Sequence, residues 1–230
     1  MCSAIKRQAG DTLENYEKNV AMAANVSRLL DAKSAGRFIY FSSAAVYGED
    51  VENTAITEMT PVEPTSYYGM AKYAAERLLL KAAGTRTPLV LLRPATIYGP
   101  EEPGRPYGPM GFLRAAMAGE TVTLWGDGEE KREFVFIDDA CEAVAGLIDH
   151  PFCGALNLVT GRSVSFRDVL AAIARIAPAP ATDCRPRSKR KADHGFDAAL
   201  LRATLPALKF TALEDALKAS REAASTGSRR

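Results

Sequence analysis

Two apolar runs on either side of a helical segment constrain the fold of this chain more than any other feature. Residues 37–41 read Arg-Phe-Ile-Tyr-Phe, and residues 88–92 read Pro-Leu-Val-Leu-Leu. Between them, residues 66–83 have the apolar spacing of a helix, and Gly84 follows as a stop. A continuous apolar run is typical of a strand buried on both faces of a parallel sheet. Strand, helix and strand at this spacing predict βαβ units and a parallel α/β sheet.

The remaining segments predict further helices and short strands. Residues 13–32 are rich in alanine and leucine and predict a helix that Asp11 or Thr12 caps. The apolar positions expected on its buried face are Val20, Ala24, Leu29 and Leu30. Further along we expect a long loop at 94–110, helices at 111–118, 138–148, 165–176, 198–205 and 213–223, strands at 121–125, 133–137 and 156–159, a loop at 185–191 and a frayed end from 225.

Composition and charge argue against several classes of protein. The 230 residues carry 29 basic and 28 acidic side chains, and a net charge of +1 gives no electrostatic reason to expect a nucleic-acid or membrane partner. The longest apolar stretches, such as residues 89–92 and 143–148, are far shorter than the roughly 20 residues of a membrane helix. The first residues hold no apolar signal core, and the four scattered cysteines form no CxxC pair. We therefore expect a cytoplasmic protein with no metal site.

The first candidate for chemistry is the pair Tyr68 and Lys72, which stand four residues apart in a predicted helix and so share one face. A nearby ammonium group favours phenolate over phenol and lowers the pKa of a tyrosine. Tyr68 is thus a candidate general acid or base toward a sugar hydroxyl or a ketone. The alternative is an exposed tyrosine beside a solvated lysine.

The second candidate is the Ser42-Ser43 pair, which directly follows the predicted strand at 37–41. Open α/β sheets bind ligands at the carboxyl ends of their strands. Ser43 could therefore hydrogen-bond the substrate oxygen that Tyr68 protonates. The alternative is a serine-rich turn with no chemical role.

Taken in order, these motifs resemble the extended short-chain dehydrogenase/reductases, specifically the NAD-dependent nucleotide-sugar epimerase/dehydratase family. The stretches that carry the resemblance are Asn19-Val20, residues 42–48 (Ser-Ser-Ala-Ala-Val-Tyr-Gly), residues 64–72, residues 92–100 (Leu-Arg-Pro-Ala-Thr-Ile-Tyr-Gly-Pro) and residues 126–139. They run over nearly the whole chain. The resemblance implies a Rossmann-type α/β domain that binds NAD, with NADP as the alternative, and a smaller C-terminal lobe that binds a nucleotide-diphosphate sugar.

The resemblance also implies roles for individual residues. Ser43, Tyr68 and Lys72 would be the catalytic residues: Tyr68 exchanges a proton with the sugar, Lys72 holds the nicotinamide ribose, and Ser43 orients the substrate oxygen. The residues implied to bind the cofactor are Asn19, Ser42, Tyr68, Lys72 and Pro94. Those implied to bind substrate are Ala44, Thr96 and Arg132.

Arginines are candidates for the diphosphate because a guanidinium group binds phosphate oxygens bidentately. Arg132 is the first candidate, and its alternative is an ion pair with Glu129 or Glu130. A second phosphate arginine is expected among Arg185, Arg187 and Arg190, with a merely solvated basic loop as the alternative. The adjacent Asp138 and Asp139 are expected to cap a helix rather than to bind a metal.

Three departures from the family pattern qualify these expectations. Dehydratases of the family carry an acidic pair after the catalytic serine or threonine, whereas this chain has Ala44 and Ala45, which disfavours dehydration. Many members have asparagine where this chain has Thr96, so sugar recognition is expected to differ. No GxGxxG or GxxGxxG motif occurs in the 230 residues. Residues 2–4 resemble the turn after the family's fourth strand, so the first βα units are expected to be missing.

The sequence thus predicts an N-terminally incomplete Rossmann-type sheet domain at residues 1–104 and 133–154, and a substrate lobe at 105–132 and 155–230. The expected function is NAD-dependent nucleotide-sugar epimerisation of the 4-epimerase type, and a complete chain is expected to form a homodimer. One alternative is an NAD(P)-dependent nucleotide-sugar or carbonyl reductase. The other is a truncated, inactive nucleotide-sugar-binding or interaction protein.

Overall fold

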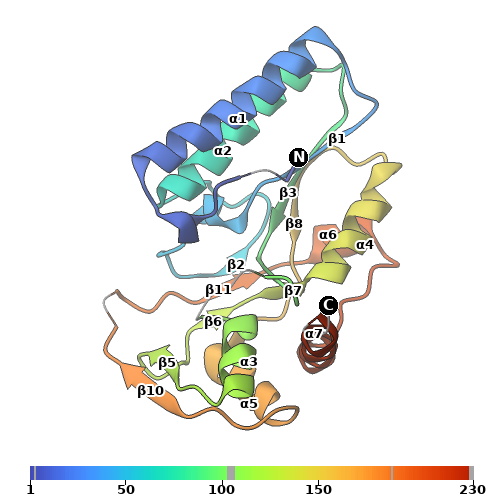
Figure 1. Ribbon diagram of the computed structural model, residues 1–230. Coiled ribbons are helices and arrows are strands. Elements are labelled where there is room, and N and C mark those ends of the chain that lie inside the picture. The colour runs from blue at the N-terminus through green and yellow to red at the C-terminus, as the bar shows by residue number, and fades with distance from the viewer. Residues whose placement is uncertain (3, 103–106, 188, 228–230) are drawn as a thin grey trace.

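A three-stranded parallel sheet forms the centre of the computed structural model, which describes residues 1–2, 4–102, 107–187 and 189–227. The strands β1 (Phe38–Phe41), β3 (Leu89–Pro94) and β8 (Gly154–Leu158) are hydrogen-bonded in the order β1-β3-β8. The main chain of Met1 lies beside β1, since its amino group donates to the carbonyl oxygen of Ile39 at 2.6 Å. The parallel α/β architecture expected from the sequence is confirmed (Figure 1).

The strand β3 is fully buried because helices cover both faces of the sheet (Figure 1). Leu89 and Leu91 face a core cluster with α1 (Leu13–Ala32) and α2 (Tyr67–Ala83). Val90 and Leu92 face a second cluster built with α4 (Ile137–Ile148) and α6 (Ala199–Thr204). The sequence of β3 is therefore continuously apolar because helices cover both of its faces, as expected.

The bounds of α1 and α2 agree with the sequence prediction, and the buried face of α1 agrees with it in part. Thr12 caps α1 and Ser66 caps α2, each accepting a backbone N–H three residues on. The buried residues of α1 are Asn19, Ala23, Ser27 and Leu30, whereas Leu29 is 63% exposed. Of the four expected positions, Leu30 is buried and Val20 and Ala24 are half-buried. The apolar pattern missed Asn19 and Ser27, because these buried side chains are polar and form hydrogen bonds within the protein.

A second body of structure packs around its own apolar cluster. It contains α3 (Pro109–Ala118), α5 (Phe166–Ala174) and α7 (Leu213–Gly227), together with the parallel pair β5 (Val122–Trp125) and β10 (Thr182–Arg185). Three two-stranded pairs lie between this cluster and the main sheet (Figure 1): β2 (Asn53–Ile56) with β11 (His194–Phe196), β4 (Thr96–Tyr98) with β7 (Phe134–Phe136), and the antiparallel β6 (Lys131–Arg132) with β9 (Val164–Ser165).

Short strands are the elements that the sequence prediction missed. The segment 94–110, expected to be a loop, contains β4, and its residues 103–106 lie outside the described part. The chain also holds two 3-10 helices that were not expected, η1 (Arg7–Ala9) and η2 (Ala44–Tyr47). The sheet domain was expected to end at residue 154, but β8 of the main sheet continues past this residue. Strands of two to four residues carry too little periodicity to be recognised without their partners.

Two expectations about helix ends hold only in part. Asp138 and Asp139 open α4 as expected, in its first turn where acidic side chains meet the helix dipole, but neither caps the helix, whose N-cap is Phe136. Asp139 instead accepts hydrogen bonds from Thr211, at 2.9 Å from its backbone N–H and 2.7 Å from its hydroxyl. The expected fraying from residue 225 is also not seen, since α7 continues to Gly227, and 228–230 lie outside the described residues.

Within the described residues, no helix is both long and apolar enough to span a membrane. In the same part of the chain, no cluster of three or more His, Cys, Asp or Glu side chains is arranged to hold a metal ion.

Candidate active site

A cavity of about 1170 Å³ opens where β1 and β3 end, between the sheet and the second body. It is lined by eight of the nine residues that the resemblance implied for catalysis, cofactor and substrate: Ser42, Ser43, Ala44, Tyr68, Lys72, Pro94, Thr96 and Arg132. These residues come from four separate stretches of the chain. Their convergence is a property of the parallel sheet, because the carboxyl ends of its strands meet at one edge.

Ser43 reaches the cavity because a tight turn brings it against α2. It caps η2, and its Oγ accepts the backbone N–H of Ala45 at 3.1 Å. The turn lies so close to α2 that a Cβ on Gly69 would stand 2.6 Å from the carbonyl oxygen of Ala45. Glycine beside Tyr68 is therefore what allows the serine turn to approach the tyrosine.

Lys72 is buried beneath Tyr68 on the same face of α2. Its Nζ donates to the carbonyl oxygen of Phe41 at 2.6 Å and lies 5.7 Å from the centre of the Tyr68 ring. Burial lowers the pKa of Lys72 to about 8, against the attraction of Cys2 and Glu76. The backbone N–H of Tyr68 donates to the Asp11 carboxylate at 3.1 Å, which ties this end of α2 to the start of α1.

A buried polar network behind Ser42 is a feature that the sequence analysis missed. Ser42 donates to Glu76 at 2.5 Å, and Arg93 holds the same carboxylate bidentately at 2.9 and 2.6 Å. Arg93 also donates to the Tyr47 hydroxyl at 2.9 Å, and that hydroxyl donates to Asn157 at 2.8 Å. The network joins β3, β8, α2 and η2, and of its members Ser42 lines the cavity. The available signal was Glu76, which lies one helical turn after Lys72.

Asn19 is the ninth of these residues and does not line the cavity, and neither do the candidates for a second phosphate arginine, Arg185, Arg187 and Arg190. Its amide accepts the backbone N–H of Ile5 at 2.7 Å and donates to the carbonyl oxygen of the same residue at 3.0 Å. Lys6, Arg7 and Gln8, which follow Ile5, do line the cavity. Asn19 thus acts on the cavity through the segment that it holds.

Arg132 lies at the cavity wall, and both readings of it find support. It forms an ion pair with Glu130, as the alternative reading expected, and it also lines the cavity. Burial lowers the pKa of its guanidinium group, and Glu130 opposes this. Of the three candidates for a second arginine, Arg187 pairs with the same Glu130, whereas Arg185 pairs with Asp183 at 2.9 Å.

The side chains at the strand ends fit the nicotinamide half of a dinucleotide. Lys72, Tyr68 and Pro94 lie together at the strand ends, where a nicotinamide ribose would need a cation and a phenol. The 230 residues hold no glycine-rich turn for a pyrophosphate. Fold and site together define a Rossmann-type α/β protein with a cavity at the carboxyl ends of its strands, which Ser43, Tyr68 and Lys72 line.

Comparisons with known proteins agree with this class. A family model described as the NAD dependent epimerase/dehydratase family matches residues 2–158. An uncharacterized UDP-glucose epimerase of Bacillus subtilis is 31% identical over 55% of this chain and 40% of its own length. A dTDP-glucose 4,6-dehydratase of Xanthomonas campestris is 31% identical over 57% of this chain and 37% of its own.

The fold is shared with solved structures. A UDP-glucose 4-epimerase from Thermotoga maritima, solved with UDP-glucose, superposes with a TM-score of 0.82 at 25% identity, over 94% of this chain and 72% of that one. This chain belongs to the NAD-dependent epimerase/dehydratase family. It spans about two fifths of the length of the two curated relatives described above.

Proposed function

We propose that this chain carries the catalytic and sugar-binding side of an NAD-dependent nucleotide-sugar epimerase of the 4-epimerase type. The observation that supports this most directly is the convergence of Ser43, Tyr68 and Lys72 on one cavity that Arg132 also lines. Relatives named as UDP-glucose epimerases point to the same substrate class.

The proposed mechanism assigns proton transfer to Tyr68. Its phenol exchanges a proton with the 4-hydroxyl of the sugar, and the Lys72 ammonium 5.7 Å from its ring favours the phenolate. Ser43 donates its hydroxyl hydrogen to the same sugar oxygen. NAD, when bound, supplies hydride acceptance from C4 and hydride return to the opposite face of the transient 4-keto sugar.

Epimerisation is favoured over dehydration by the residues after Ser43. Ala44 lines the cavity half-buried, and Ala45 is buried. Neither methyl group can protonate a leaving hydroxyl or abstract a proton from carbon. The large cavity therefore has no acid or base at the positions where dehydratases of the family carry them.

Binding of a nucleotide-diphosphate sugar is proposed for Arg132 together with Arg187, because both guanidinium groups already hold an anion. We also propose a cytoplasmic homodimer for the complete protein. Leu29 on α1 and Met70 and Leu80 on α2 are exposed apolar side chains that a partner would cover.

Turnover of UDP-glucose tests the proposal. The chain is completed at its N-terminus with the glycine-rich segment of an epimerase relative, and UDP-galactose formation is measured. Tyr68→Phe should reduce the rate about 10²–10⁴-fold, because it removes only the acid–base hydroxyl. Tyr67→Phe, at an exposed neighbouring position on α2, is the matched control.

The same assay separates the alternatives. Net consumption of NADH or NADPH with a carbonyl substrate would identify the reductase instead. Nucleotide-sugar binding without any turnover would identify the non-catalytic protein, and accumulation of a 4-keto-6-deoxy sugar would overturn the argument from Ala44 and Ala45.

A further inference from the structure

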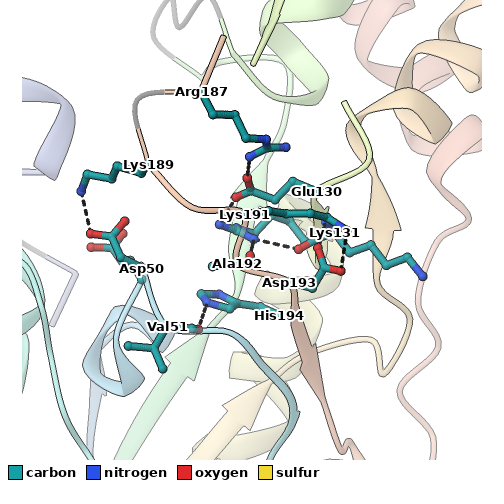
Figure 2. Close-up of polar contacts among 12 residues, drawn as sticks. Asp50, Val51, Glu130, Lys131, Arg187, Lys189, Lys191, Ala192, Asp193 and His194 are labelled. Carbon is teal, nitrogen blue, oxygen red and sulfur yellow. Dashed lines mark hydrogen bonds and ion pairs between the residues drawn. The ribbon is translucent and has the colours of Figure 1, made fainter. Parts of the chain in front are cut away.

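A second, smaller cavity of about 200 Å³ adjoins the large one and is rich in charge. Figure 2 shows two ion pairs between its lining residues, Arg187 with Glu130 and Lys189 with Asp50. Its basic residues are Arg132, Arg187, Lys189 and Arg190, its acidic residues are Glu49, Asp50 and Glu130, and Tyr107 and Trp125 also line it. Three of these residues, Glu49, Asp50 and Arg132, line the large cavity as well. The two spaces are therefore neighbours at one site.

Glu130 occupies the position between the two arginines of this cavity. One of its carboxylate oxygens accepts from Nη2 of Arg132 and the other from Nη1 of Arg187. Its side chain is 16% exposed, and those of Arg132 and Arg187 are 20% and 19% exposed. The carboxylate thus bridges two largely buried guanidinium groups, as an anionic ligand would.

The position of Arg187 is fixed by the backbone beneath it. Gly126 has φ +66°, and a Cβ there would stand 2.5 Å from Nε of Arg187. Within the described part of the chain, Nη2 of Arg187 is buried and has no hydrogen-bond partner. Arg187 therefore holds one more donor than Glu130 uses, and a buried donor without a partner is costly.

The contacts of Glu130 argue that an incoming diphosphate must displace it. Its two carboxylate oxygens already accept from Arg132 and Arg187, and all three side chains line this cavity of about 200 Å³. A diphosphate would use both arginines and the spare Nη2 donor, but the Glu130 carboxylate stands between the same groups and would repel it.

We propose that Glu130 is an internal competitor for the arginine pair, so that a diphosphate binds only when the Glu130 carboxylate leaves Arg132 and Arg187. The inference rests on the proposed function, because it concerns the same nucleotide-sugar site. Its consequence is a ligand that binds more weakly and leaves faster than two arginines alone would allow. Glu130 is in this sense a residue that sets affinity, and it takes no part in the chemical step.

Calorimetry on the 230-residue chain with UDP and with inorganic pyrophosphate tests the inference. Glu130→Gln removes the charge but keeps the shape, and we expect it to tighten binding of both probes roughly tenfold or more. Glu129→Gln is the matched control: it removes the same charge one residue away, where Glu129 pairs with the exposed Arg167 at 3.1 Å. It should change either affinity less than twofold.

The possible outcomes separate this inference from the proposed function. Equal binding of UDP by the parent chain and Glu130→Gln overturns the competition and leaves the function standing. A gain for pyrophosphate with no detectable UDP binding supports the competition and contradicts the nucleotide-sugar function. Equal gains in Glu129→Gln and Glu130→Gln would show a general charge effect and also overturn the inference. Glu130→Ala, which removes the carboxylate entirely, should reproduce the gain.

Discussion

At the scale of single residues, Lys72 combines two demands that oppose each other. Its ammonium group is needed beside Tyr68 in the proposed mechanism, yet burial makes the charge unfavourable and lowers the pKa of Lys72 to about 8. The protein compensates in part with the carbonyl oxygen of Phe41 at 2.6 Å. A buried lysine whose pKa lies near 8 is a feature of functional sites more often than of structural ones.

The first prediction is that the buried charge of Lys72 lowers the free energy of unfolding at neutral pH. Between about pH 8 and 10.5 the unfolded chain holds a proton that the folded chain has released at Lys72, so the free energy of unfolding should rise with pH. The rise is on the order of 3 kcal/mol. Lys72→Met should lack it and be the more stable protein at pH 7.

Urea unfolding at several pH values between 7 and 10.5 measures this effect as a difference between variants. Lys81→Met, at an exposed position of the same helix, is the control and should follow the parent chain. Parallel curves for the parent chain and Lys72→Met would show that the lysine is not titrating in the folded protein as proposed.

Gly69 gives a second prediction at the same scale. In Gly69→Ala the new methyl group would meet the Ala45 carbonyl oxygen at 2.6 Å and the Pro64 side chain at 3.0 Å, so the η2 turn must move. We expect a loss of about 1–3 kcal/mol in the free energy of unfolding, despite the higher helix propensity of alanine.

Thermal and urea unfolding check the Gly69 prediction. Gly36→Ala is the matched substitution, because a Cβ there has no neighbour within 4 Å. If Gly69→Ala and Gly36→Ala had the same free energy of unfolding, α2 and the Ser43 turn would be less tightly joined than the contacts indicate.

At the scale of elements, α1 and α2 do more than cover the sheet. α2 presents Tyr68, Lys72 and Glu76 along one side, toward the cavity and the buried network. α1 holds the N-terminal segment through Asn19, and that segment lines the same cavity. Both α1 and α2 therefore position residues of the site as well as covering the sheet.

The third prediction concerns the link between α1 and the N-terminal segment. Asn19→Ala removes both hydrogen bonds to Ile5, so the segment that carries Lys6 and Arg7 should open locally while the rest of the protein stays folded. Amide hydrogen exchange should show faster exchange at Ile5, by roughly one to two powers of ten, since two hydrogen bonds are lost.

Asn25→Ala, on an exposed side of the same helix, is the control and should leave Ile5 protected. Unchanged protection of Ile5 in Asn19→Ala would show that other contacts hold the segment.

At the scale of the whole molecule, the proposed catalytic residues and Arg132 line one cavity, and no glycine-rich turn occurs in the 230 residues. The pyrophosphate of NAD carries two negative charges, which need backbone N–H donors and a helix N-terminus.

The fourth prediction is that the 230-residue chain binds NAD poorly. Several charge-assisted hydrogen bonds, each worth about 1.5–3 kcal/mol, are lacking, so affinity should be weaker than micromolar by orders of magnitude. Calorimetry with NAD measures this, and UDP binding by the same sample shows that the arginine site is folded. Micromolar or tighter NAD binding would contradict the prediction.

The sequence by itself determined the class of fold and the residues around the large cavity. The apolar run at 89–92 predicted a buried parallel strand, because a strand covered on both faces is apolar at consecutive positions. Cap residues were sufficient for helix ends, since Thr12 and Ser66 satisfy backbone N–H groups of their own helices. These are local properties, and a linear pattern records them.

Only the tertiary structure decided which partner each polar group takes. Asn19 was expected at the cofactor, but it binds Ile5. Glu130 was one of two candidate partners for Arg132, and it bridges Arg132 and Arg187. The buried Ser42–Glu76–Arg93 network likewise joins residues up to 51 positions apart. Hydrogen bonds and ion pairs depend on distance and direction in space, which spacing along the chain does not encode once the residues belong to different elements.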